Sequence, residues 1–148
     1  MTSLEPSHSP HNVGHGEHLE VIAIRPETET LTYQRLPYFV GISNATVGAT
    51  GISMNLVVIP PGGAVEPHSH PDYETAIYIL KGRVETRYGA GLKQSMINKA
   101  GDFIFIPPNA PHQATNLSLT ETVQAIVARN YPNEQEHVVL YDLSESSS

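Results

Sequence analysis

The stretch that decides the fold is PGGAVEPHSHPDYE, residues 61–74. Two histidines, His68 and His70, stand one residue apart among glycines and prolines, and Glu74 follows four residues later. The flanking prolines favour an extended backbone, because proline and the residue before it both disfavour helix. In an extended segment, side chains two apart point to the same face, with Cα atoms about 6–7 Å apart. Both imidazoles can therefore converge on one point, and Glu74 has the same parity.

These side chains form a donor set for a divalent metal ion. Imidazole nitrogens and a carboxylate oxygen suit Mn, Fe, Co, Ni, Cu or Zn, and the chain has no cysteine, which excludes thiolate ligands and disulfides. At least one more ligand must come from elsewhere. His112 is the candidate, because it follows the Pro-rich turn IPPNAP and opens the strand-like run HQATN. We expect an antiparallel partner to place it beside the first pair.

The chain between its ends has the pattern of short strands. Runs of mostly five to eight residues are rich in Val, Ile, Thr and Tyr, and Gly, Pro or Asn separates them. The runs are LEVIAI, TLTYQRL, GISMNLVVI, TAIYIL, RVETRY, DFIFI, HQATNL, TVQAIVA and HVVLY. A weak helical period appears only near residues 38–50. Many short, evenly spaced strands predict an all-β fold, either an antiparallel sandwich or a closed barrel.

The first stretch resembles the first motif of the cupin superfamily. That motif is Gly, five residues, His-any-His, three or four residues, Glu, six residues, Gly. This sequence has Gly62, His68 and His70 in that spacing, then Glu74 after three residues, but seven residues separate Glu74 from Gly82. The departure leaves an alternative open: with a four-residue spacer, the glutamate position is Thr75 and the site has three histidines.

A second stretch, residues 101–116, resembles the second cupin motif. That motif is Gly, five residues, Pro, any, Gly, two residues, His, three residues, Asn. Gly101, Pro107, His112 and Asn116 match it, and Asn109 replaces the middle glycine. The replacement is mild, because asparagine tolerates the left-handed conformation of a turn.

The resemblance implies an antiparallel jelly-roll β-barrel, the double-stranded β-helix of RmlC-like proteins, as one domain over residues 19–143. It also implies a divalent transition metal (Mn, Fe, Zn, Ni or Co) held by His68, His70, Glu74 and His112. Residues 1–18, which are rich in Ser, Pro, Gly and His, are predicted to be a flexible tail, and residues 144–148 a short C-terminal tail.

Two further kinds of residue are candidates for work on a substrate. Tyr78 shares the parity of Glu74, so it is a candidate catalytic residue that faces the lumen and transfers a proton; the alternative is a barrel-filling aromatic. Arg35 and Arg129 are isolated cations in strand-like runs that could hold a substrate carboxylate. For both arginines the alternative is a surface position or an ion pair at the rim.

Composition limits the partners and the location. The 148 residues have the size of one domain, and the formal net charge of −7 argues against nucleic acid or an anionic membrane as the main partner. No apolar run approaches the roughly 20 residues that cross a bilayer. The first 18 residues lack the apolar core of a signal peptide, so a cytoplasmic protein is expected.

The resemblance implies a metal-dependent enzyme of the dioxygenase, isomerase, decarboxylase or lyase class that acts on a small, oxygen-rich metabolite. One alternative is a non-catalytic module that binds a sugar or small metabolite, and another is an assembly protein whose metal only stabilises the fold. A homodimer is expected, because the N-terminal part and the run HVVLY exceed what one barrel needs and could extend a neighbour's sheet.

Overall fold

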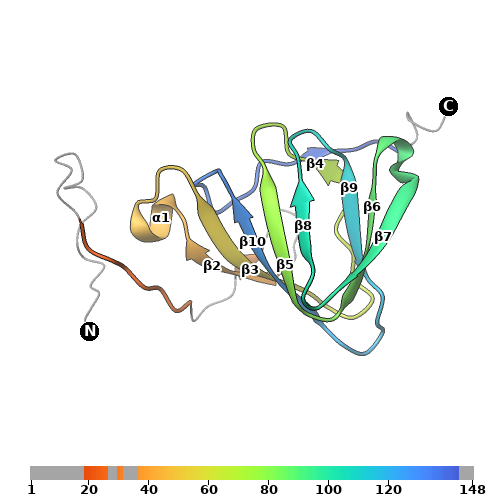
Figure 1. Cartoon of the computed structure of the whole chain (residues 1–148), viewed down its shortest axis with the longest axis horizontal. Helices are drawn as coiled ribbons and strands as arrows, with labels where there is room; N and C mark the ends of the chain where they lie inside the picture. The colour runs from red at the N-terminus through yellow and green to blue at the C-terminus, as the bar shows by residue number, and fades with distance from the viewer. Residues whose placement is uncertain (1–18, 27–29, 32–36, 144–148) are drawn as a thin grey trace.

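The protein is a barrel of two antiparallel sheets (Figure 1). The computed structural model describes residues 19–26, 30–31 and 37–143, so the tails predicted at residues 1–18 and 144–148 lie outside the described residues. The all-β jelly-roll prediction is confirmed. The elements are β1 (Thr30–Leu31), β2 (Pro37–Ile42), α1 (Asn44–Val47), β3 (Ser53–Ile59), β4 (His68–Ser69), β5 (Thr75–Lys81), β6 (Arg83–Tyr88), the 3₁₀ turn η2 (Ala90–Leu92), β7 (Gln94–Lys99), β8 (Phe103–Ile106), β9 (His112–Asn116), β10 (Val123–Arg129) and β11 (Val139–Leu140).

The strand order brings distant parts of the chain together. One sheet has the order β1-β2-β3-β10-β5-β8, and the other has the order β11-β4-β9-β6-β7. Strand β10 lies between β3 and β5, and β9 lies between β4 and β6 (Figure 1). The chain changes sheets between β4 and β5, which is inside the first histidine-bearing stretch. That change of sheet decides which side chains of the stretch face inward.

Side-chain alternation builds the core. Along β5, Thr75 and Ile79 are buried whereas Leu80 is exposed, and along β10 every second residue from Val123 to Val127 is buried. This period of two is the signature of a strand with one face on the core. The hydrophobic core gathers from both sheets, and its members are Ile59, Ile79, Val84, Val123 and Ala125. Burying each large aliphatic side chain stabilises the fold by about 1.5–3 kcal/mol.

Two turn residues have positive φ for identifiable reasons. Gly82, between β5 and β6, has φ 92°, and a Cβ there would lie 2.7 Å from Cγ2 of Val123. Only glycine satisfies both the backbone and the packing at this corner. Asn109 has φ 69°, so the residue that replaces the motif glycine does adopt the left-handed conformation. The expectation that asparagine serves at this turn is confirmed.

The strand predictions differ from the structure at several places. Residues 19–24 form no strand; they extend away from the barrel, and Leu19 and Val21 are 88% and 93% exposed (Figure 1). Strands β2 and β7 were not among the predicted runs. Strand β7 is mostly exposed and polar, QSMINK, and lies at a sheet edge, where no apolar alternation marks it.

The weak helical period near residues 38–50 corresponds to a single turn, α1. Ser43 caps its N-terminus, with its hydroxyl accepting the N–H of Thr46, and Gly48 ends it with φ 75°. Strand β2 occupies the first part of that region.

The C-terminal run HVVLY is used within the chain. Its residues Val139 and Leu140 form β11, which pairs with β4. Because β11 is the edge strand of its sheet, its other side is not paired within the described residues, and the extension of a neighbour's sheet by this run stays a prediction. None of the helical segments in the described ranges has the length and apolar character needed to cross a membrane.

Candidate metal centre

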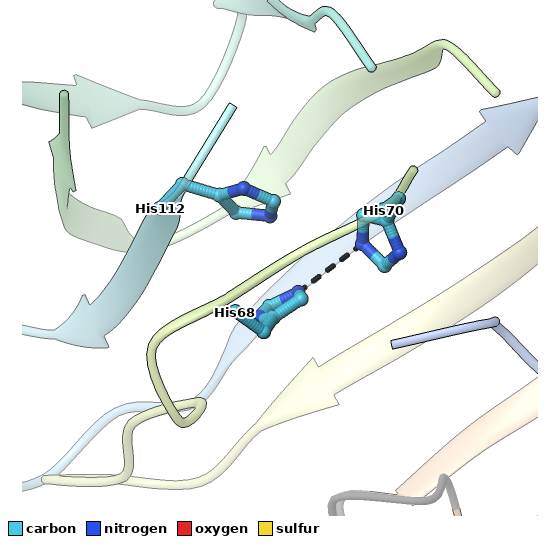
Figure 2. A group of neighbouring side chains, drawn as sticks. All are labelled: His68, His70 and His112. Carbon is cyan, nitrogen blue, oxygen red and sulfur yellow. Dashed lines mark hydrogen bonds between the residues drawn. The ribbon is translucent and has the colours of Figure 1, made fainter. Parts of the chain in front are cut away.

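Three histidines converge in the cavity of the barrel (Figure 2). His68 lies in β4 directly opposite His112 in β9, across the antiparallel ladder, and His70 follows β4. One ring nitrogen from each lies within 4.8 Å of the others, and all three residues are buried. The expectation that an antiparallel strand brings His112 to the first pair agrees with this register.

The turn of the second stretch is tied to the first stretch. The backbone N–H of Asn109 donates to the carbonyl oxygen of His70 at 2.8 Å. Nδ2 of Asn116, at the end of β9, lies 2.8–3.1 Å from the carbonyl oxygens of Ile59, Pro60 and Glu121, which share its two hydrogens. These bonds fix the two stretches against one another, so the histidines are held by the scaffold before any ligand binds.

Backbone carbonyls determine which nitrogen carries the proton in two of the three rings. Nδ1–H of His68 donates to the Glu66 carbonyl at 2.6 Å, and Nδ1–H of His112 donates to the Ala110 carbonyl at 2.9 Å. Nδ1 of His70 lies 3.0 Å from the carbonyl oxygen of His137. A carbonyl can only accept, so Nδ1 of His68 and of His112 carries the proton and the Nε2 lone pair of each of these rings is available. Metal-binding histidines have this arrangement. Nδ1 of His70 has a second partner, the Tyr73 hydroxyl at 2.8 Å, which can donate to it or accept from it.

The two Nε2 atoms of His68 and His70 lie 3.1 Å apart, as the dashed line in Figure 2 shows. In the metal-free protein this contact is a hydrogen bond if His70 carries its proton on Nε2 and its Nδ1 accepts from the Tyr73 hydroxyl. A shared cation would take the place of that proton between the two nitrogens. Two ligands at about 2.0–2.2 Å from one ion lie roughly 3.0–3.5 Å apart, so the observed spacing fits a common divalent metal.

Burial keeps the three rings neutral at neutral pH. It lowers the pKa of His70 and of His112 to about 4, and it lowers the pKa of His68. The negative charge of Glu136 opposes this effect at all three rings without reversing it. A neutral imidazole is the form that binds a metal, so the site does not need to lose protons at pH 7.

The histidines line a cavity of about 120 Å³ between the two sheets. This volume is below the roughly 300–1,000 Å³ of pockets for drug-sized ligands, so it suits a small molecule. Beyond the histidines the wall is largely aliphatic, from Val57, Ile59, Ile77, Ile79, Val84, Ile104, Ile106, Val123 and Val127. Polar side chains gather in the same lining, including those of Asn55, Thr75, Arg129 and Glu136.

Glu74 does not join the histidines. It is exposed, and its backbone N–H donates to Oδ1 of Asn130 at 2.8 Å. The parity argument fails because residues 71–72 form a bend and residues 73–74 are not in a strand, so alternation does not carry over from β4. Thr75 starts β5 and is the residue that faces the cavity, 3% exposed.

The position of Thr75 resolves the spacing of the first motif. With a four-residue spacer after His70, Thr75 occupies the glutamate position, and six residues then separate it from Gly82, as the motif requires. The structure thus favours the alternative in which strand β5 brings no carboxylate to the site.

Tyr78 lies on the other face of β5. Its ring contacts that of Phe103 with centroids 4.6 Å apart, and in the part of the chain that the structure describes it is not among the cavity-lining residues. The prediction that Tyr78 faces the lumen is wrong, because the inward row of β5 begins at Thr75 rather than Glu74.

Arg129 and Glu136 form an ion pair beside the histidines. Arg129, at the end of β10, places Nη2 3.4 Å from Oε1 of Glu136, and the two side chains are 9% and 10% exposed. The same carboxylate oxygen lies 3.6 Å from Nε2 of His70. Arg129 therefore lines the cavity and has the ion pair that the sequence left as its alternative. Sequence reasoning missed Glu136, since it lies in a segment without strand or motif.

Three polar atoms in the cavity wall have no hydrogen-bond partner among the described residues. They are Nδ2 of Asn55, Oγ1 of Thr75 and Nε of Arg129. An unpaired buried polar group costs about 1–3 kcal/mol, so such atoms mark positions where a ligand or water supplies the partner.

Comparisons with known proteins agree with this architecture. The sequence model of the family described as Cupin domain matches residues 55–128. Germin-like protein subfamily T member 3 of Arabidopsis thaliana is 36% identical over 90 residues, which is 57% of this chain and 38% of the plant protein. The chain thus spans well under half of that relative.

Solved structures share the fold. A Cupin 2 conserved barrel domain protein from Salinispora arenicola is 25% identical, with a TM-score of 0.61 over 74% of this chain and 89% of that one. An oxalate oxidase in complex with the substrate analogue glycolate is 24% identical, with a TM-score of 0.64 over 89% of this chain and 68% of that one.

Proposed function

Because the chain belongs to the cupin domain family, we propose that it is a small metal-dependent enzyme. It binds one divalent transition metal (Mn, Fe, Zn, Ni or Co) through His68, His70 and His112 and acts on a small, oxygen-rich metabolite in the barrel cavity. The reaction belongs to the dioxygenase, isomerase, decarboxylase or lyase class. A fold that hosts many chemistries does not select among these four.

The observation that carries the proposal is the convergence of three buried, neutral imidazoles on one point. The Nδ1 atoms of His68 and His112 are engaged by backbone carbonyls, so their Nε2 atoms are the available donors. A divalent ion held there supplies Lewis-acid polarisation of a carbonyl or enolate, or oxygen activation if the metal is redox-active.

The cavity wall supports an oxygen-bearing substrate. Nδ2 of Asn55 and Nε of Arg129 are both donors, buried and without a partner among the residues described, and a substrate oxygen would accept from them. The hydroxyl of Thr75 can donate or accept at the same wall. The aliphatic remainder of the cavity excludes water and limits the size of the substrate.

The test begins with metal analysis of protein purified without added metal. We expect about one ion per chain in the wild type and a loss of that ion in His68→Ala, His70→Ala and His112→Ala. Stoichiometry unchanged in all three variants would reject the metal site. The protein is then incubated with a library of small hydroxy acids, keto acids and sugars to detect turnover. Turnover at the metal site should be lost when a chelator is added and restored by one particular metal. Oxygen uptake separates dioxygenase chemistry from redox-neutral chemistry.

The same library separates the enzyme from the non-catalytic alternative. Tight binding of a sugar or metabolite that leaves the molecule chemically unchanged would favour a binding module. If chelation only lowers the melting temperature, and no small molecule binds, the metal has a structural role.

We propose further that the protein forms a homodimer in the cytoplasm. The outer face of the β5–β8 pair supports self-association, because Phe103 and Phe105 are 81% and 61% exposed beside the partly exposed Tyr78 and Leu80. A second copy of this apolar face can cover it. Light scattering after gel filtration should give twice the chain mass, and Phe103→Lys should halve it; cell fractionation tests the location.

A further inference from the structure

The carboxylate of the metal site comes from an unexpected part of the chain. We propose that Glu136, in the segment after β10, is the acidic metal ligand, in place of the glutamate that the family motif would have at position 75. This inference rests on the proposed metal site at the three histidines and extends it by one residue.

The first observation is that β5 contributes no acid. The motif position is occupied by Thr75, whose hydroxyl faces the cavity without a partner among the residues described. The nearest acid in sequence, Glu74, is exposed and turned away from the cluster. The first motif therefore leaves a place beside the histidines that a carboxylate from elsewhere can fill.

The second observation is the position of Glu136. Its Oε1 lies 3.6 Å from Nε2 of His70, the nitrogen that also faces Nε2 of His68. Two donors of one ion lie roughly 3.0–3.5 Å apart, so this spacing is close to that of a shared metal. Among the residues described, the group whose ligand atoms all lie within 4.8 Å of one another consists of the three histidines. Glu136 reaches this group on the side of His70, so its carboxylate must shift toward the other two rings when the ion binds.

The third observation is that the residues on both sides of Glu136 are held. The Gln135 side chain donates to Oη of Tyr38 at 2.9 Å, and the His137 N–H donates to Oη of Tyr73 at 3.0 Å. The imidazole of His137 also pairs with the carboxylate of Asp72. Because these contacts lie on either side of Glu136, its carboxylate is directed into the site although the segment is neither helix nor strand.

The fourth observation is the balance of charge. Three neutral imidazoles leave the two charges of a divalent ion uncompensated, and the guanidinium of Arg129 adds a third positive charge within the same wall. Uncompensated charge in a largely apolar cavity is strongly unfavourable. Two acids line the cavity, Glu134 and Glu136. Oε1 of Glu134 accepts from the Ser43 hydroxyl, whereas Glu136, at 10% exposure, lies against both Arg129 and His70 and is the anion placed to compensate both cations.

The test measures the affinity of the full chain for Mn²⁺ and for Ni²⁺ by competition with a chromophoric chelator. We expect Glu136→Gln to weaken Mn²⁺ binding at least about tenfold and to weaken Ni²⁺ binding less, because carboxylates suit Mn and imidazoles suit Ni. Glu74→Gln is the matched control and should leave both affinities unchanged. The double variant Thr75→Glu with Glu136→Gln restores the family arrangement and should recover most of the lost Mn²⁺ affinity.

The outcomes separate this inference from the proposed function. Equal weakening of both ions would show a merely structural role for Glu136 and overturn the inference, as would unchanged affinities. In both cases loss of binding in His112→Ala would leave the three-histidine site standing. A wild type that binds neither ion would reject the metal site and the inference with it. If Glu136→Gln does not fold, Glu136→Asp keeps the charge, shortens the reach and is judged by the same criteria.

Discussion

The two motif stretches deliver their side chains to the site in different ways. In the second stretch, the turn at Asn109 leads straight into β9, and His112 stands at the first ladder position, opposite His68. In the first stretch, a bend at residues 71–72 interrupts the path between β4 and β5. The difference teaches that side-chain parity holds only along a hydrogen-bonded strand. Where the chain passes from one sheet to the other, the alternation of inward and outward side chains starts again with the new strand.

Lowering the pH affects histidines of both stretches at once and should give the largest change in the free energy of unfolding. His70 and His112, one from each stretch, have pKa values lowered by burial from the ordinary 6.5 to about 4. Between those values the unfolded chain binds more protons than the folded chain, so stability of the metal-free protein falls as pH drops from about 7 towards 4. Urea unfolding with chelator at pH 7, 6 and 5 measures this.

His112→Gln is the control for the acid experiment, since it removes one of the two groups. Its stability should fall less steeply over the same pH range than that of the wild type. A wild-type stability that stays constant from pH 7 to 5 contradicts the buried, neutral state of these rings.

Substituting alanine for the glycine at the boundary of each motif should lower the stability of the protein by unequal amounts. Gly82 and Gly101 both have positive φ, 92° and 100°, so alanine strains either turn by about 1–3 kcal/mol. At Gly82 the added Cβ also lies 2.7 Å from Cγ2 of Val123, whereas at Gly101 nothing lies within 4 Å among the residues described. Overpacking adds about 1–3 kcal/mol at Gly82 alone. Thermal and urea unfolding of Gly82→Ala and Gly101→Ala should show that order, and equal losses would contradict it.

The smallest effect is expected at Asn109, in the turn of the second stretch. A φ of 69° is less favourable for alanine than for asparagine, so Asn109→Ala should lower the free energy of unfolding by about 1 kcal/mol. Asn109→Gly gives the family's residue and should stay within about 0.5 kcal/mol of the wild type. Unfolding of both variants measures the difference. Should Asn109→Ala prove as stable as Asn109→Gly, the turn does not depend on the left-handed conformation.

The sequence predicted the barrel and the histidine cluster because both depend on local patterns. Strand alternation, turn residues and the spacing of His68, His70 and His112 can all be read within short windows. The facing of Glu74 and Tyr78 was wrong because it depended on how Pro71 and its neighbours bend between sheets. Glu136 carried no signal, because its approach to His70 depends on tertiary contacts between segments far apart in the chain.

The contacts of residues 132–138 with the barrel run through side chains and single backbone bonds, such as those of Tyr38, Tyr73 and Asn44, and not through a ladder. Replacing residues 132–138 with a different loop would change the side chains that line the cavity, and every strand would keep its register. The scaffold and its reactive lining can therefore be varied separately, which makes this loop the natural place to begin redesigning the protein.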